Sequence, residues 1–520
     1  MAILGSLLKG GIKLRKMVDQ EKRLPSGLQN EELRELLTKA QFTELGRTFD
    51  FERLLRSSGR FHSKGDLYER FRQQVPIYNY DKIFREWWHR AKAGEENVCW
   101  PGKTRYFALS SGTSEAATKH IPITRDMAKA IRRTSIRQIL SLSNYPDLPG
   151  KLYQKGILML GGSTHLNFNG TFFEGDLSGI SASQLPFWFQ HFYKPGRKIA
   201  QNPDWNSKLD EITRQASSWD IGVIVGVPAW IQILMERIID FYGVETIHDV
   251  WPNLMVYTHG GVAFDPYRSG FEKLLAHPIT YIETYLASEG FIAFQAQPNR
   301  RSMRMVLNNG IFFEFVPFNA NNFNADGDLV ENPQTLMIDE VEEDKDYALL
   351  LSTCAGAWRY LIGDVIRFVS KAESEIVITG RTKHFLSLCG EHLSVDNMNR
   401  AVELVAKDLN ITIREFTVAG IPYGTMFAHQ WYIGTDDDPD PDQLRDRLDQ
   451  RLQELNDDYR VERIAALKEV LVKVLPAEAF YKWMKLKGKE GGQNKFPRVL
   501  KKALYEDWEH FVSAQMEFER

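Results

Sequence analysis

The chain has 520 residues, of which 43% are hydrophobic and 26% are charged, and its formal net charge is −3 at pH 7. This length is sufficient for roughly three domains, or for one large α/β enzyme with a sizeable core. The 65 basic and 68 acidic residues nearly balance, which argues against a partner such as nucleic acid or an anionic membrane that binds by charge. The three cysteines, Cys99, Cys354 and Cys389, provide neither a disulfide framework nor a paired metal-ligand spacing, so we expect a cytoplasmic protein.

The first residues, MAILGSLLKGGIKLRK, are apolar and then basic. A secretory signal would carry its charges before the apolar run, so this order predicts a docking helix rather than a targeting segment. Association with a membrane surface is the alternative. No uninterrupted run in the chain approaches the ~20 apolar residues of a spanning helix, so we expect no membrane span.

Helical and strand-like segments alternate through the first part of the chain. Helices are predicted within 31–56 and after 78–81, where apolar residues recur at helical spacing. Short apolar runs bounded by Gly or Pro predict buried strands within 156–162, 220–228, 253–261 and 278–290, with an amphipathic helix from 229 to 243. Such alternation predicts layers of α/β structure, with ligands bound at the loops beyond the strand ends.

Closely spaced strand-like runs follow between about 310 and 368. They predict a β-rich section, and a small barrel is one arrangement that it could adopt. The segment 380–394, GRTKHFLSLCGEHLS, has no sustained period, and we place a domain boundary there. We therefore predict a large domain over 1–380 and a small α+β domain over 381–520, with a helix at 395–409. The acidic run 436–442, DDDPDPD, is predicted as a solvated turn rather than a cation site.

The stretch SSGTSEAATK, residues 110–119, follows the apolar residues 106–109 and ends on Lys119. It is not a Walker A loop, because its lysine lies seven positions after Gly112. A loop rich in hydroxyl groups and backbone amides nevertheless suits a polyphosphate whose charge Lys119 helps to neutralise. A flexible surface loop is the alternative.

Two acidic residues stand in comparable positions. Glu289 lies in YLASEG, where a carboxylate after a strand can hold a magnesium ion that bridges phosphates. Asp364 ends WRYLIGD, and a buried acid there needs donors such as the two hydroxyl groups of a ribose. Each acid alone is better explained by a turn or a cap, and only their ordered occurrence favours the ligand roles.

The order of SSGTSEAATKHIP, THGGVAFDPYR, YLASEG, WRYLIGD and GRTKHFLSLCGEHLS resembles the GH3 family of acyl-acid amido synthetases, within the adenylate-forming ANL superfamily, and a bacterial-type member of it. The resemblance extends over most of the chain, including GVPAWIQILMERI and NKFPRVL. It implies an enzyme that uses ATP and Mg²⁺ to adenylate a carboxylic acid and passes the acyl group to the amine of an amino acid. The small C-terminal domain is then expected to be mobile.

The resemblance also implies roles for individual residues. Lys119 and Lys495 match catalytic lysines, Lys495 on the mobile domain, and Glu289 matches the magnesium-associated acid. Asp364 matches an aspartate that binds ribose. The positions implied to bind ATP are Ser110, Ser111, Gly112, Thr113, Ser114, Gly260, Gly261, Thr284, Tyr285, Asp364, Arg381 and Lys383, the last two in the hinge. Ala116 departs from the family loop, which often has a second glycine there.

Several alternatives remain open from the sequence. Coenzyme A could replace the amine as acceptor, although no obvious basic cluster for its 3′-phosphate stands out, and a nucleotide sensor without catalysis is a third possibility. The acyl pocket is expected between Gly161 and Trp230, where aromatic residues suit an aromatic or medium-length apolar acid. His120, His165 and His259 are expected to be packed or capping residues, with His120 the one candidate to face a substrate because it follows Lys119.

Overall fold

The structure is a computed structural model that describes residues 24–56, 66–110, 119–185, 187–261, 264–298, 300–324, 327–382, 385–386, 393–423, 426–456, 459–460, 463, 467–489 and 495–518. The predicted docking helix at the N-terminus lies outside these residues. So do residues 111–118 of the predicted phosphate loop, Lys383 and Cys389.

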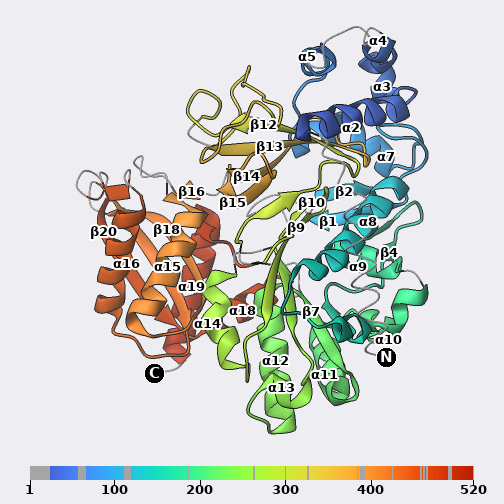
Figure 1. The fold of residues 1–520 in the computed structure, drawn as a ribbon. Coiled ribbons are helices and arrows are strands. Elements are labelled where there is room, and N and C mark those ends of the chain that lie inside the picture. Colours follow the sequence, from blue (N-terminus) through green and yellow to red (C-terminus); the bar gives the residue numbers. More distant parts are fainter. Residues whose placement is uncertain are drawn as a thin grey trace.

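The centre of the molecule is an open sheet of eleven strands among the described residues, in the order β12-β13-β14-β15-β11-β10-β9-β8-β7-β3-β6 (Figure 1). Four predicted strands are confirmed as neighbours that run parallel: β3 (Gly156–Leu160), β7 (Ile221–Gly226), β8 (Val256–Gly260) and β9 (Thr280–Ala287). Their apolar runs are nearly continuous because helices cover both faces of a parallel sheet. The carboxyl ends of these four strands therefore meet along one edge.

Helices of the large domain surround this sheet. The predicted amphipathic helix is α12 (Pro228–Tyr242), which begins at a proline and ends at Gly243 in the left-handed conformation with φ 62°. The other helices of this domain are α2 (Pro25–Ala40), α3 (Glu44–Thr48), α4 (Phe51–Arg56), α5 (Asp66–Gln74), α6 (Tyr80–Ile83), α7 (His89–Lys92), α8 (Arg125–Ser141), α9 (Leu177–Ser183), α10 (Arg197–Ala200), α11 (Trp205–Gln215), α13 (Ile247–Val250) and α14 (Asp265–Lys273). A π-helical turn, Phe84–Trp88, joins α6 to α7.

A second, smaller sheet has the order β2-β1-β5-β4. Its strands are β1 (Tyr106–Ser110), β2 (Lys119–Ile123), β4 (Asn167–Phe168) and β5 (Phe173–Gly175). The apolar residues 106–109 before the predicted phosphate loop thus belong to β1, and Ser110 pairs with Lys119 where β2 begins. Both ends of the predicted loop are fixed by this antiparallel pair.

The β-rich section forms an antiparallel extension of the large sheet, made of β12 (Ile311–Pro317), β13 (Asp346–Thr353), β14 (Tyr360–Ser370) and β15 (Glu375–Arg381). The barrel considered from the sequence is not formed among the described strands. Instead, β15 pairs with β11 (Met303–Met305), and β11 pairs with β10 (Gly290–Phe294), which is the hairpin partner of β9. The section therefore continues the sheet from β9 rather than closing on itself.

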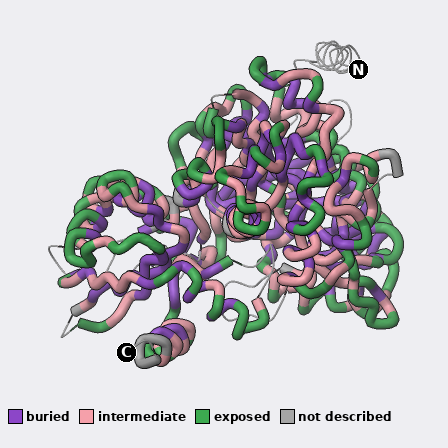
Figure 2. The backbone as a smooth tube through the Cα atoms, turned by 90° about the horizontal axis from the view of Figure 1, so that it is seen from below, coloured by how far each residue is buried: buried purple, intermediate pink, exposed green. Residues whose placement is uncertain are grey.

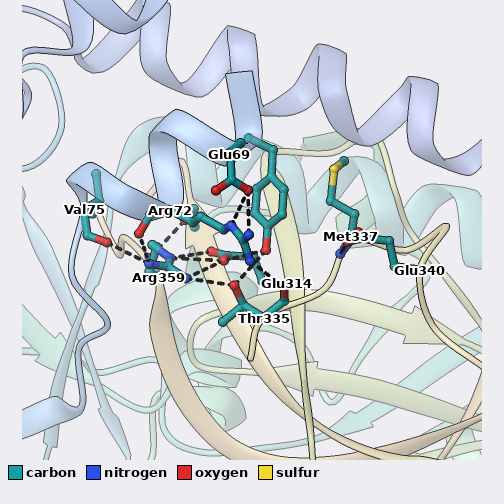
Figure 3. Close-up of polar contacts among 10 residues, drawn as sticks. Glu69, Arg72, Val75, Glu314, Thr335, Met337, Glu340 and Arg359 are labelled. Carbon is teal, nitrogen blue, oxygen red and sulfur yellow. Dashed lines mark hydrogen bonds and ion pairs between the residues drawn. The ribbon is translucent and has the colours of Figure 1, made fainter. Parts of the chain in front are cut away.

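A buried ion pair ties this extension to the N-terminal helices (Figure 3). The Arg359 guanidinium donates to the Glu314 carboxylate at 2.9–3.0 Å and to the carbonyl oxygens of Arg72 and Val75 at 2.7 and 2.8 Å. Both charges are almost fully buried, and such a pair is tolerated because every oxygen and N–H finds a partner. Arg359 thereby holds the start of β14, five residues before Asp364.

The C-terminal domain is built on a sheet whose described strands have the order β20-β19-β18-β21, and it lies beside α14 and β15 in Figure 1. Its strands are β18 (Ile413–Tyr423), β19 (Met426–Thr435), β20 (Leu467–Leu475) and β21 (Val499–Leu500), and its helices are α15 (Val395–Leu409), α16 (Pro441–Leu455), α18 (Ala477–Leu486) and α19 (Lys502–Phe518). The short strands β16 (Phe385–Leu386) and β17 (Leu393–Ser394) precede α15, and β6 (Tyr193–Lys194) closes the edge of the large sheet.

Two cores lie on the two sides of this C-terminal sheet. One is shared by α15, α16 and the strands, whereas the other joins α18 and α19 to α11, α12 and α14 of the large domain. Figure 2 shows the buried backbone running through the interior of both parts. The C-terminal domain thus packs on the large domain through its α18 and α19 side.

Two smaller expectations can also be compared with the structure. Residues 436–440 of the acidic run form a mostly exposed turn, as predicted, and Asp440 caps α16, which begins at Pro441. None of the described helices is both long and apolar enough to cross a membrane.

Candidate active site

A cavity of about 800 Å³ lies at the carboxyl edge of β3, β7, β8 and β9. Its lining includes residues of the large domain and, from the C-terminal domain, Lys489 and residues 495–498. The predicted site residues that line it are Lys119, Gly260, Gly261, Thr284, Tyr285, Glu289, Asp364, Arg381 and Lys495. Residues far apart in the sequence are therefore brought to one partly open cavity.

Asp364 has two partners inside the cavity. The Tyr285 hydroxyl donates to its Oδ2 at 2.5 Å, and the Arg381 Nε lies 2.8 Å from its Oδ1. Asp364 and Arg381 face each other across β14 and β15, so the ladder register sets this ion pair. The Asp364 charge is the largest cause that raises the pKa of Arg381, and burial followed by the same charge raises the pKa of Tyr285. The carboxylate keeps lone pairs for a further donor.

A second part of the site contains two residues of opposite charge, Lys119 and Glu289. Lys119 starts β2, and its ammonium lies 5.4 Å from the centre of the Tyr80 ring. Burial lowers the pKa of Lys119, which the Glu289 charge opposes. Glu289 is 7% exposed in the turn between β9 and β10, and burial, followed by the Asp364 charge, raises its pKa. A cation and two carboxylates thus meet in a space of reduced solvation.

Two glycines at the end of β8 allow other parts of the chain to approach closely: β9 approaches Gly260, and the Lys495 side chain approaches Gly261. A Cβ on Gly260 would lie 2.4 Å from the carbonyl oxygen of Thr284 on the adjacent strand. Gly261 has φ 85°, and a Cβ there would lie 3.2 Å from the Lys495 Nζ. The Thr284 hydroxyl accepts a hydrogen bond from Gln138 of α8 at 2.5 Å. A residue larger than glycine at position 260 would push β9 away, and one at position 261 would push Lys495 away.

Lys495 reaches the cavity from the segment before β21. Burial, followed by the positive charge of Arg381, lowers its pKa to about 8. Lys495 is nevertheless exposed to solvent, because its side chain faces the open space of the cavity. The neighbouring Phe496 packs against Phe480, Trp483 and Trp508, which fixes the segment on the core that the two domains share.

A polar contact between the domains was not predicted from the sequence. The Tyr267 hydroxyl of α14 donates to the Glu415 Oε1 at 2.8 Å, and the Arg498 guanidinium donates to the Glu415 Oε2 at 2.5 Å. The Arg498 Nη2 also lies 3.3 Å from the Tyr267 oxygen. Tyr267 and Arg498 both fall in motifs quoted above, DPYR and NKFPRVL, but nothing in those motifs indicates that they meet at Glu415.

His120 and His259 agree with their expected structural roles, whereas His165 does not. His120 lies beside the Glu174 carboxylate at 3.1 Å and does not line the cavity. His259 is buried against Phe264, and burial lowers its pKa to about 3, so its imidazole is neutral. His165 is exposed. His259 does line the cavity, but as a neutral group.

The expected acyl segment between Gly161 and Trp230 contributes part of the wall, including Ile180, Phe189 and Phe192. Trp230 itself packs on Trp205, with 5.0 Å between the centres of the two rings. Further apolar lining that the sequence did not indicate comes from α8, β3 and the turn before β3: Ile131, Ile139, Leu142, Leu152, Tyr153, Ile157 and Met159. These residues read as ordinary core in the sequence.

Of the remaining predicted positions, Ser110 ends β1, whereas Ser111, Gly112, Thr113, Ser114 and Lys383 lie outside the described residues. Their roles stay predictions.

Comparison with known proteins places this site in a family. The GH3 family N-terminal domain matches residues 14–210, the central domain 304–380 and the C-terminal domain 396–503. Indole-3-acetic acid-amido synthetase GH3.2 of Arabidopsis thaliana is 25% identical over 166 residues, which are 30% of this chain and 30% of that protein. Indole-3-acetic acid-amido synthetase GH3.4 of the same plant is 27% identical over 124 residues, 23% of this chain and 20% of that protein. The matched stretches thus span less than a third of these relatives.

Solved structures agree in fold over nearly the whole chain. The GH3.15 acyl acid amido synthetase matches with a TM-score of 0.76 and 16% identity, covering 97% of this chain and 96% of that one. A 2-hydroxyisobutyryl-CoA ligase in the postadenylation state, in complex with 2-HIB-AMP, matches with a TM-score of 0.59 and 10% identity over 94% of this chain and 91% of that one. The matched domains and the shared fold lead to one conclusion: the chain belongs to the GH3 family.

Proposed function

We propose that this protein is an ATP-dependent ligase that adenylates a carboxylic acid and transfers the acyl group to the amine of an amino acid, with release of pyrophosphate and AMP. The observation that carries the proposal is the single cavity in which Lys119, Glu289, Asp364, Arg381 and Lys495 meet. Membership of the GH3 family and the amido synthetase names of its relatives support it.

In the first half-reaction a carboxylate oxygen attacks the α-phosphorus of ATP, and the bond to pyrophosphate breaks. The protein must hold the two groups in line and stabilise the charge that spreads over the phosphate oxygens. Lys119 and Lys495 supply positive charge from two sides of the cavity. The free lone pairs of Asp364 accept the ribose hydroxyl groups, while Tyr285 and Arg381 keep the carboxylate in place.

Glu289 fits the role of a magnesium ligand. It is a nearly buried carboxylate that faces the cavity, and a Mg²⁺ ion that bridges phosphates needs only one or two protein carboxylates. The ion would neutralise phosphate charge. It would also offset the burial of the Glu289 charge and its repulsion by Asp364, which together raise the pKa of Glu289.

In the second half-reaction the amine nitrogen attacks the acyl carbon, the nitrogen loses its proton, and the bond to AMP breaks. The amine must enter where pyrophosphate has left. We propose that residues 381–520 move relative to residues 1–380 between the two steps, as a mobile domain does in enzymes with lids. The boundary is supported by the end of β15 at Arg381 and the start of α15 at Val395.

The test is ATP–pyrophosphate exchange with a panel of acids that includes indole-3-acetate and 2,4-DB, the acids named in GH3 relatives, together with benzoate and hexanoate. Product is then identified by mass after addition of amino acids or coenzyme A. Amide formation supports the proposal, whereas a thioester would assign the protein to the CoA ligases that share its fold. ATP binding without exchange for any acid would favour a nucleotide sensor. The free, buried thiols of Cys99 and Cys354 fit the cytoplasmic location that we also propose.

A further inference from the structure

A second lysine faces the cavity away from the proposed nucleotide site. Lys208 lies on α11 and is 3% exposed, and it lines the cavity together with Gly161, Gly162 and Ser178. Its ammonium donates one hydrogen bond, to the carbonyl oxygen of Gly161 at 3.3 Å, and lies 5.5 Å from the centre of the Trp205 ring. No described carboxylate lies within 4.0 Å of it.

A buried ammonium in this position is incompletely satisfied. Lysine has three N–H donors, and one of them has a protein acceptor here. Asp176 is the carboxylate whose charge acts on Lys208, but it forms no ion pair with Lys208 within 4.0 Å, and its Oδ1 accepts from the backbone N–H and the hydroxyl of Ser178. Because a buried charge is costly unless it is paired and hydrogen-bonded, an anion in the cavity is the missing partner.

Another lysine of the cavity lining, Lys155 directly before β3, provides a contrast. Lys155 also lines the cavity, yet its ammonium lies 2.5 Å from the Asp220 carboxylate. The charge of Lys155 is therefore satisfied within the protein, whereas that of Lys208 is available to a ligand. The two lysines differ in pairing rather than in access to the cavity.

The position of Lys208 separates it from the reacting carboxylate. Its acceptor Gly161 follows β3, and Gly261, next to Lys495, follows β8, with β7 between them. Two strand spacings of about 4.8 Å place these points roughly 10 Å apart. The carboxylate that attacks ATP must lie beside Lys119 and Lys495, so Lys208 faces a different part of the substrates.

Resting on the function proposed above, we infer that Lys208 binds a substrate carboxylate that does not react. The α-carboxylate of the amino acid acceptor fits the separation of roughly 10 Å between the two lysine sites. With this carboxylate at Lys208, the amine of the amino acid points back toward β8 and the acyl carbon. A second carboxylate on the acid substrate has the same chemistry and is the other source.

The test uses Lys208→Met, which keeps the length of the side chain and removes its charge, and Lys155→Met as the matched control. Exchange is measured with the monocarboxylic acid that the wild-type enzyme activates best, and amide formation with L-alanine, L-glutamate and the corresponding α-amides. Lys208→Met is expected to leave exchange within about twofold of wild type and to raise the KM for the amino acids on the order of tenfold to a hundredfold, as loss of a charge-assisted hydrogen bond predicts. The KM for the amides and the kinetics of Lys155→Met should not change.

Three results separate the possibilities. A KM increase confined to dicarboxylic acids in the exchange assay would assign the carboxylate to the acid and still support the Lys208 site. Equal changes for amino acids and their amides, or no change for any substrate, would overturn it. Wild-type enzyme provides a second measure that needs no variant: failure to distinguish an amino acid from its amide, and a monoacid from a diacid, also overturns the inference. Absence of exchange in the wild type would instead overturn the proposed function.

Discussion

At the scale of single residues, the site depends on charges whose cost of burial is only partly relieved by neighbours. Asp364 is well paired, because Tyr285 and Arg381 each take one of its oxygens. Glu289, Lys119 and Lys495 are less well paired, and burial moves the pKa of each toward the neutral form. A bound magnesium–nucleotide complex would supply the missing opposite charges, so these residues favour binding at the expense of stability.

Asp364→Asn tests the nucleotide contact. The amide keeps the shape of the carboxylate but removes its charge, so ATP affinity should fall by about 1.5–3 kcal/mol, the value of a charge-assisted hydrogen bond. The measurement is the dissociation constant of ATP by calorimetric titration. Tyr285→Phe is the matched control, because it removes a partner of Asp364 while the charge remains, and its loss should be smaller. An unchanged ATP affinity in Asp364→Asn would contradict the assignment.

The rate of the first half-reaction should fall at high pH because Lys495 loses its proton. Its pKa is lowered from 10.5 to about 8, so the ammonium that stabilises phosphate charge is lost as the pH rises through about 8. Acyl-adenylate formation at subsaturating ATP, which reports the ionisation of the free enzyme, should therefore decline above that pH. In Lys495→Arg, whose guanidinium stays charged, this decline should disappear. The same decline in both proteins would assign it to another group.

The lowered pKa of Lys495 has the opposite consequence for stability. Between about pH 8 and 10.5 the unfolded chain holds the proton that the folded protein has released, so the free energy of unfolding should rise with pH across this window. Chemical denaturation at several pH values checks the sign. Lys495→Met should remove this contribution.

At the scale of secondary-structure elements, α14 and β18 are joined by the hydrogen bond from Tyr267 to Glu415. Tyr267→Phe leaves Glu415 paired with Arg498 but removes one of the polar links between the domains. The Lys273–Thr412 and Arg414–Glu236 contacts remain. The expected cost is about 1–3 kcal/mol, because a buried polar group loses one partner. Hydrogen exchange should quicken in α14, β18 and the segment of Lys495, while elements such as β12 and β13 stay protected.

Tyr281→Phe is the control for this link. The Tyr281 hydroxyl is also buried, but it has no hydrogen-bond partner among the described residues, so its removal should cost little. Similar losses of stability in the Tyr281 and Tyr267 variants would show that the hydroxyl of Tyr267 does not connect the domains.

At the scale of the whole molecule, the C-terminal domain brings Lys495 to a cavity built mainly by the large domain. If this domain moves between the half-reactions, Lys495→Ala should slow formation of the acyl-adenylate by on the order of a hundredfold, as loss of one preorganised charge stabiliser does. Amide formation from a supplied acyl-adenylate should survive. Single-turnover kinetics of each step measures both, and equal losses would contradict a role confined to one arrangement.

The predicted hinge near Gly380 also concerns the whole molecule, because the two domains meet there. Gly380 lies inside β15, where it pairs with Val365, so a proline there would break the strand ladder as well as stiffen the chain. A substitution at Gly380 is therefore a poor probe of motion. The Tyr267 contact, which lies between the two domains, is the better one.

Local patterns were enough to predict much of the fold from the sequence. The alternation of apolar runs and breakers located β3, β7, β8, β9 and α15, because buried strands and amphipathic helices depend on residues close in sequence. The motifs also named Lys119, Glu289, Asp364 and Lys495, which the structure brings to one cavity.

Only the tertiary structure decided the features that depend on distant partners. The β-rich section extends the main sheet instead of closing a barrel because β15 pairs with β11, about seventy residues earlier, and no local pattern specifies that choice. Likewise, the sequence shows Lys208 as one more helical lysine. Its unpaired charge becomes visible when α11 packs against the end of β3, since the pairing of a buried charge depends on which residues share its surroundings.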